Sequence, residues 1–244
     1  MPTLIEKREF KETSLTQAPS PIEDFELRRC TFDACQESGS DDPAQRPVLR
    51  NVSLIRCRAY VSDLIPVIAE DCVVDTLWLH RGIWGEQMIW GCAFKHVVVR
   101  GRIQGAIRFA PSRQWWSSWP QGPGPTDPFV LANNRFYEDV DWALDISGAA
   151  FTGIEMELSG IPSRLIRRDR ETQVVITRER ILGAGWTWNE GDIVTNPRYW
   201  SIKKFMDAGF ADAVLVAPKA NKKFFAQDLG ALRALREEGL AEPD

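Results

Sequence analysis

Four acidic residues close together are the best candidates for chemistry in this chain: Glu138, Asp139, Asp141 and Asp145. Two neighbouring carboxyl groups can serve as general acid and general base, the pair that cleaves glycosidic bonds. A five-residue repeat, described below, predicts that Asp139 and Asp141 point inward, where a carboxylate is costly unless it is paired. This departure from the apolar pattern of the repeat marks a candidate catalytic site with Asp139, Asp141 or Asp145 as acids. A local widening of the chain at a register slip explains the inward aspartates equally well.

A tryptophan-rich loop is the strongest candidate for binding. Residues 111–127 read PSRQWWSSWPQGPGPTD, and this density of Pro and Gly predicts a loop. Such a loop cannot build its own core, so exposing Trp115, Trp116 and Trp119 is costly unless a partner covers them. The alternative is that the loop folds back and buries the three rings on a face of the same molecule.

The elements that position these residues follow a five-residue repeat. From Val52 to Val99, positions i and i+2 of each pentad are mostly apolar or small, beginning with Val52 and Leu54, Cys57 and Ala59, Val67 and Ala69, Cys72 and Val74. Alternate side chains of an extended segment point the same way, so these residues are expected to face a shared interior. Four pentads make one predicted coil, and Cys72 and Cys92 mark this period.

The repeat extends beyond this core segment. It precedes Val52 at Phe25 and Leu27, and it returns after the loop at Phe129 and Leu131, Asn134 and Phe136, Leu144 and Ile146, Ala149 and Phe151, and later Val174 and Ile176. A fixed internal period is typical of solenoids, in which each coil buries its interior by stacking on its neighbours. We therefore predict an all-β fold, a right-handed parallel β-helix or solenoid of about seven coils over residues 25–176.

The residues resemble the pentapeptide-repeat proteins, whose four-sided right-handed solenoid has Ala, Cys or Ser at position i and Leu or Phe at i+2. Cys30-Thr-Phe32, Cys92-Ala-Phe94 and Ala149-Ala-Phe151 fit this pattern. The family favours Asn or Asp at i+1, which most pentads here lack. A more irregular right-handed β-helix is therefore the alternative.

Stacked coils also predict which outward side chains are neighbours. A period of four pentads places Tyr60, His80 and Arg100 in one column, and Arg58 and Trp78 in another. Columns of Arg and aromatic rings can be cation–π ladders that only stabilise the face. They can equally form a flat recognition surface, because Trp, Tyr and Arg dominate binding hot spots.

The two ends of the chain lie outside the predicted coils. Residues 1–24 are expected to form an N-terminal segment or cap. Residues 177–244 are expected to form a mostly helical α/β cap or a partner-binding subdomain, with a helix near 197–208, a strand at 213–217 and a helix within 222–240. A cap protects the unpaired strand edge at the end of a solenoid.

Composition narrows the function classes. The net charge of −4 and the pI near 5.4 argue against a dedicated nucleic-acid binder. No apolar run is long enough for a signal peptide or a membrane span, so we expect a cytoplasmic protein. The five cysteines include no C-x-x-C pair and lie mostly at inward positions, so we expect core thiols, no metal site and no cofactor.

These observations predict a cytoplasmic, non-catalytic protein that binds another protein as a scaffold, adaptor or immunity-type inhibitor. The expected binding residues are Trp115, Trp116, Trp119, Trp78, Arg58, Tyr60, His80 and Arg100. Some pentapeptide-repeat relatives imitate duplex DNA, but arginines interrupt any acidic stripe here. The alternatives are a carbohydrate-active β-helix enzyme that uses the acids at 138–145, and a structural filament unit.

Overall fold

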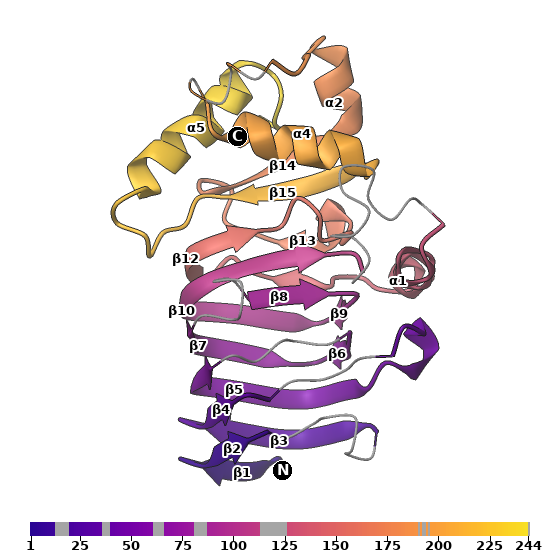
Figure 1. The fold of residues 1–244 in the computed structure, drawn as a ribbon, viewed down its shortest axis with the longest axis vertical. Coiled ribbons are helices and arrows are strands. Elements are labelled where there is room, and N and C mark those ends of the chain that lie inside the picture. Colours follow the sequence, from indigo (N-terminus) through magenta and orange to yellow (C-terminus); the bar gives the residue numbers. More distant parts are fainter. Residues whose placement is uncertain are drawn as a thin grey trace.

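A computed structural model describes residues 1–12, 20–35, 40–60, 66–80, 87–112, 126–189, 191, 194 and 196–243. Within these residues, thirteen strands form one large sheet in which every pairing is parallel. The strands are stacked from the N-terminal end of the molecule to a group of helices at the other end (Figure 1). The protein is thus strand-rich, and its parallel sheet is compatible with a parallel β-solenoid.

The main path through this sheet runs in the order β1-β3-β5-β7-β10-β11-β13, and the remaining strands pair at its sides. The strands are β1 (Thr3–Glu6), β2 (Glu9–Lys11), β3 (Ile22–Arg28), β4 (Thr31–Asp33), β5 (Val48–Tyr60), β6 (Ile68–Glu70), β7 (Val73–His80), β8 (Gln87–Trp90), β9 (Ala93–Lys95), β10 (Val97–Ala110), β11 (Leu144–Asp145), β12 (Ala149–Glu155) and β13 (Ile166–Arg167). Since β1 and β2 pair with β3 and β4, the parallel stack begins before residue 25.

The predicted inward cysteines are confirmed. Cys30, Cys57, Cys72 and Cys92 are all buried, and their small side chains fit the narrow interior between strands. Arg29 and Arg56, the residues just before Cys30 and Cys57, have φ angles of 55° and 54°. These left-handed corners turn the chain from one extended segment into the next.

The predicted coil period of four pentads holds for only one pair of neighbours on the main path. Ser53 pairs with Val73, four pentads further along the chain, but Val73 pairs with Val98, which is five pentads further. Phe25 pairs with Val52, a longer step that the sequence pattern predicts. An added pentad leaves the five-residue pattern intact, so the pattern cannot reveal that the step from one paired strand to the next has become longer. The expected stacking of Cys92 on Cys72 is therefore wrong.

The coil predicted around residues 129–136 is also wrong, because this segment is helix α1 (Pro128–Glu138). Asp127 caps the helix by accepting hydrogen bonds from the backbone N–H groups of Phe129 (2.8 Å) and Val130 (3.2 Å). Pro128 occupies the first helical turn, where its missing N–H has no partner to lose. The Asp-Pro dipeptide therefore starts a helix in residues that also satisfy the pentad pattern.

Helix α1 is attached to the strand stack through a buried arginine. The Arg46 guanidinium, which follows the short 3-10 helix η2 (Pro43–Gln45), donates to Asn133 Oδ1 (2.5 Å) and to the Gly91 carbonyl oxygen (3.0 Å). The hydroxyl of Tyr137 accepts a hydrogen bond from the Phe94 backbone N–H (3.3 Å). These contacts satisfy polar groups that would otherwise be costly to bury.

The described residues of the C-terminal region include a small sheet of two strands and three helices. The antiparallel strands are β14 (Gln173–Thr177) and β15 (Asp212–Val216), and the helices are α2 (Arg178–Gly183), α4 (Arg198–Ala208) and α5 (Phe225–Glu237); a second 3-10 helix, η4 (Ser163–Leu165), precedes β13. The helix predicted near 197–208, the strand at 213–217 and the helix within 222–240 are confirmed. Val174 and Ile176 lie in this antiparallel pair, whereas the pentad pattern predicts a further coil there.

The antiparallel pair lies between two hydrophobic cores. Val175, Val214 and Val216 belong to the core of the strand stack, whereas Val174, Ile176 and Leu215 belong to the core under α4 and α5. Alternate side chains of a strand point to opposite faces, so one two-stranded sheet can serve both cores. The C-terminal region thus covers the end of the stack.

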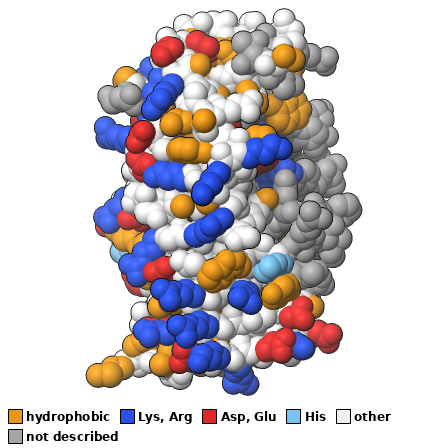
Figure 2. Space-filling view, turned by 90° about the vertical axis from the view of Figure 1, so that its left-hand side faces the viewer, with side chains coloured by type: hydrophobic (Ala, Val, Ile, Leu, Met, Phe, Trp, Pro, Cys, Tyr) orange, Lys and Arg blue, Asp and Glu red, His pale blue; other side chains and the backbone are white. Residues whose placement is uncertain are grey.

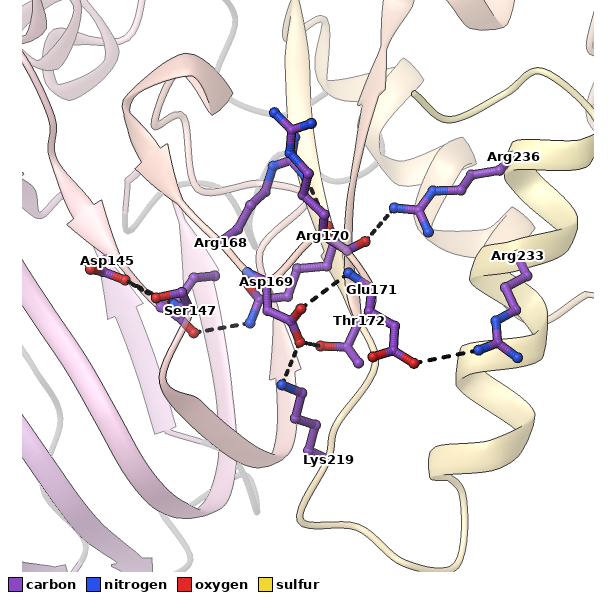
Figure 3. A network of polar contacts seen from close by, with 12 residues as sticks. Asp145, Ser147, Arg168, Asp169, Arg170, Glu171, Thr172, Lys219, Arg233 and Arg236 are labelled. Atoms are coloured by element: carbon purple, nitrogen blue, oxygen red, sulfur yellow. Dashed lines mark hydrogen bonds and ion pairs between the residues drawn. The ribbon is translucent and has the colours of Figure 1, made fainter. Parts of the chain in front are cut away.

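Polar contacts in the connecting loop join the stack to this region (Figure 3). Asp169 accepts a hydrogen bond from Thr172 Oγ1 (2.8 Å) and forms an ion pair with Lys219 (2.5 Å). Glu171 faces Arg233 of α5 at 3.6 Å. Because Lys219 follows β15 and Arg233 lies in α5, the loop contacts two separate parts of the C-terminal region.

Candidate recognition surface

Four predicted binding residues lie together on β5 and β7, and we call them the aromatic ladder: Arg58, Tyr60, Trp78 and His80. Tyr60 pairs with His80, and their rings stack with centroids 4.2 Å apart and an angle of 7° between planes. Arg58 pairs with Trp78, and its guanidinium carbon lies 5.8 Å from the centre of the indole. Since residues i and i+2 of a strand share a face, the ladder is one continuous surface.

Arg100 does not join this ladder. It pairs with Asp75, and its Nε donates to Asp75 Oδ2 at 2.9 Å. The reason is the additional pentad between β7 and β10, because of which Arg100 pairs with Asp75 rather than with His80, five residues further along β7. The column predicted from Tyr60 through His80 to Arg100 therefore ends at His80.

The tryptophans of the predicted binding loop, Trp115, Trp116 and Trp119, lie outside the described residues. The expectation that they bind a partner stays a prediction.

The three candidate catalytic acids have different surroundings. Asp139 is exposed at the end of α1, and Asp141 is exposed with 72% of its side-chain surface accessible. The expectation that both point inward is therefore wrong, because α1 replaces the predicted coil. Asp145 accepts hydrogen bonds from the backbone N–H (3.0 Å) and hydroxyl (2.7 Å) of Ser147, as the close-up shows (Figure 3).

Asp141 belongs instead to a cluster around His96. His96 Nε2 lies 2.6 Å from Asp141 Oδ1, and Nδ1 lies 3.0 Å from Asp71 Oδ1. The hydrogen bond to Asp141, with a further one to Asp71, raises the pKa of His96, although partial desolvation opposes this. The same hydrogen bond lowers the pKa of Asp141. The ring of His96 also lies against Trp142, with centroids 4.8 Å apart.

His96 stands in a column of left-handed corners that we call the polar corner: Asp24, Asn51, Asp71 and His96. The strand pairings place these residues in register. Asn51 Nδ2 donates to Asp24 Oδ1 at 2.5 Å, and Asp71 contacts His96 as described. Members of the polar corner therefore satisfy one another's hydrogen bonds.

A second column, the basic corner, is a feature that the sequence analysis missed. Its members are Lys7, Arg29 and Arg56, with φ angles of 54° to 55°. The Lys7 backbone N–H donates to the Arg28 carbonyl oxygen, and the Arg29 N–H donates to the Ile55 carbonyl oxygen, both at 2.9 Å. The one available signal was the Arg-Cys dipeptide, which occurs at both Arg29 and Arg56.

Two adjoining hollows share Arg29 and Arg56 as lining residues. One, of about 270 Å³, is also lined by Glu6, Arg28, Asp75 and Thr76. The other, of about 350 Å³, is also lined by Thr31, Arg58 and Trp78. Through Arg58 and Trp78 the second hollow reaches the aromatic ladder. Figure 2 shows a face of the molecule on which Lys and Arg side chains gather along much of the stack.

The positive charge at these hollows is only partly compensated. Arg29 Nη1 lies 3.9 Å from Glu6, and Arg28 is paired with Glu26. In the described part of the chain, Arg56 and Arg58 have no ion pair with a carboxylate. A protein of net charge −4 thus carries a local excess of positive charge on one face.

Across the described residues, no three His, Cys, Asp or Glu side chains are grouped as ligands for a metal ion. None of the described helices combines the length and apolar character needed to cross a membrane. No protein-family model, curated protein or solved structure matches this chain.

Proposed function

We propose that this chain is a non-catalytic protein-binding solenoid. In this proposal the parallel sheet is a right-handed β-helix with a C-terminal α/β cap, and its aromatic ladder recognises another protein. The observation that carries the proposal is the stacked pair of Tyr60 and His80 beside the pair of Arg58 and Trp78. Trp115, Trp116 and Trp119 are further partner-binding residues in the proposal.

The residue types of the ladder support a binding role. Tyr, Trp and Arg contribute most to binding hot spots, because they bury a large area and also form directed polar contacts. The ladder side chains of Arg58 and His80 are exposed, and those of Tyr60 and Trp78 are half-buried. A partner can therefore reach the surface.

The backbone under the ladder supports the same proposal. β5 and β7 stay in register from Cys57 and Leu77 to Tyr60 and His80, so hydrogen bonds between strands hold the four side chains in fixed relative positions. A surface that is ordered before binding loses less conformational entropy when a partner docks.

All five cysteines carry free thiols, in keeping with a protein of the reducing cytoplasm.

A paired-variant binding experiment tests the proposal. The tagged protein and the double variant Tyr60→Ala, His80→Ala are used to capture partners from an extract of the source organism, and the captured protein is then purified. Its affinity for the double variant is expected to fall about tenfold or more, because two central contact rings are lost.

The matched control is the double variant Leu131→Ala, Leu182→Ala, which also removes two exposed apolar side chains but from α1 and α2. It is expected to bind the partner as the parent protein does. Equal affinity for the parent and the ladder variant, with unchanged circular dichroism, would show that the ladder is not the binding surface.

A further inference from the structure

The basic corner places like charges close together along the stack. Neighbouring strands of a sheet lie about 4.8 Å apart, and strand pairing aligns Arg29 with Arg56 on adjacent coils. Like charges directly opposite each other on neighbouring strands repel and are destabilising. Such an arrangement is energetically relieved when an anion lies between the two guanidinium groups.

The two hollows give an anion access to these arginines. Arg29 and Arg56 line both hollows, and Arg58 adds a third guanidinium to the second one. Within the described residues, the guanidinium groups of Arg56 and Arg58 are not paired with a carboxylate. Guanidinium groups bind carboxylates through two parallel hydrogen bonds, so each is suited to one acidic side chain.

From this geometry we infer that the hollows around Arg29 and Arg56 bind a short acidic segment of a partner protein. The inference rests on the proposed protein-binding function and names the chemistry of the segment recognised. Carboxylates of the segment lie against the basic corner, while neighbouring side chains of the partner reach the aromatic ladder through Arg58 and Trp78.

The small extent of the basic corner favours an acidic peptide over a nucleic acid. The basic corner covers only three successive coils, from Lys7 to Arg56, and the chain as a whole is acidic. A nucleic-acid binder requires a longer basic face to track the phosphate backbone.

The test uses fluorescein-labelled hexaglutamate as the probe and measures its fluorescence anisotropy at low ionic strength. The parent protein is expected to bind hexaglutamate, and the double variant Arg29→Gln, Arg56→Gln is expected to bind it about tenfold or more weakly. The control variant Arg135→Gln, Arg164→Gln removes the same amount of charge from exposed positions elsewhere and is expected to leave binding unchanged.

Three results would overturn the inference: no binding of hexaglutamate by the parent protein, an equal loss of binding in both double variants, or tighter binding of a hexathymidylate probe that the Arg29 and Arg56 changes abolish. The last result would point to a nucleic acid.

The inference and the proposed function can fail separately. If Tyr60→Ala, His80→Ala abolishes binding of the captured partner while Arg29→Gln, Arg56→Gln does not, the protein-binding function stands and the acidic segment is excluded.

Discussion

The polar corner and the basic corner have the same backbone and opposite side-chain chemistry. Both are columns of residues in the left-handed conformation, aligned by strand pairing. In the polar corner each contact joins a donor to an acceptor, as from Asn51 to Asp24. In the basic corner Arg29 and Arg56 are both cations. The first column therefore contributes to stability from within the chain, whereas the second is suited to a ligand from outside it.

Position in the fold does not decide the role of a corner, because the two columns share their backbone conformation and differ in their side chains. A residue with positive φ is strained in either column, at a cost of about 1 kcal/mol or more for a non-glycine residue. Hydrogen bonds within the column offset this strain in the polar corner. No such bond between side chains is found among the described members of the basic corner, so the strain and the charge there are not compensated within the column.

The largest expected effect concerns Gly101, which continues the basic column above Thr76 with a φ of 70°. In Gly101→Ala the new Cβ would clash with Thr76 Oγ1 and lie 3.0 Å from Asp75 Oδ1. Gly209→Ala is the matched control, because Gly209 has a φ of 78° and, apart from its neighbours in the chain, the described residues place no atom within 4 Å of an added Cβ. Urea unfolding is expected to show that Gly101→Ala costs about 1 to 2 kcal/mol more than Gly209→Ala. Equal losses would mean that the corner is loosely packed.

A smaller loss of stability is expected for His96→Ala. This change removes the contacts with Asp71 and Asp141 and the ring that lies against Trp142. The free energy of unfolding is expected to fall by about 1 kcal/mol. Arg56→Ala in the basic corner is expected to change it by less than about 0.5 kcal/mol, since relief of like-charge repulsion offsets lost packing. Thermal melts of the two variants compare the corners directly, and the reverse order would contradict their distinction.

The contribution of the polar corner to stability is expected to depend on pH. Because the pKa of His96 is raised in the folded protein, its contribution is complete below its ordinary value of 6.5 and is lost as pH rises through the raised value. Because the pKa of Asp141 is lowered, its contribution is present above its ordinary value of 3.8 and is lost as pH falls through the lowered value. The stability advantage of the parent over His96→Gln is thus expected to be greatest between about pH 4 and 6.5. A constant difference from pH 5 to 9 would exclude this coupling.

The smallest expected effect concerns Cys57, which directly follows Arg56. Burial raises the pKa of the Cys57 thiol to about 11, although hydrogen bonds with the backbone, first that of Cys30, oppose this shift. Alkylation of Cys57 by iodoacetamide at neutral pH is therefore expected to be slow in the folded protein and fast after unfolding. Arg56→Gln is expected to change the folded rate by less than about twofold. A large decrease in the alkylation rate of the folded protein would mean that the positive charge of Arg56 stabilises the thiolate of Cys57.

Local patterns predicted much of the fold. Side-chain alternation predicted the inward cysteines. Pro197, which favours a helix start, and Gly209, which favours a helix end, predicted helix α4. Helix α1 was missed because its apolar residues also fit the pentad pattern. The Asp127-Pro128 dipeptide is a helix start signal, and its capping hydrogen bonds prevail over the repeat in this segment.

The sequence predicted the candidate surface correctly only where it also predicted the number of residues between paired strands. Tyr60 and His80 stack because four whole pentads separate them in paired strands. Arg100 was misplaced because one more pentad separates the next pair of strands. The basic corner was missed because Arg29 and Arg56 are distant in sequence and share only the Arg-Cys dipeptide, which does not by itself indicate contact. The net charge of the whole chain is negative, so it gave no indication that one face carries an excess of positive charge.

By itself, the sequence determined which side chains face inward, because alternation along an extended segment depends only on neighbouring residues. Only the tertiary structure decided which strands pair and in which register, since strand pairing joins residues that are several pentads apart and any whole number of pentads preserves the pattern. Register placed Arg29 beside Arg56 and His96 beside Asp71. The chemistry of the surface follows from that register.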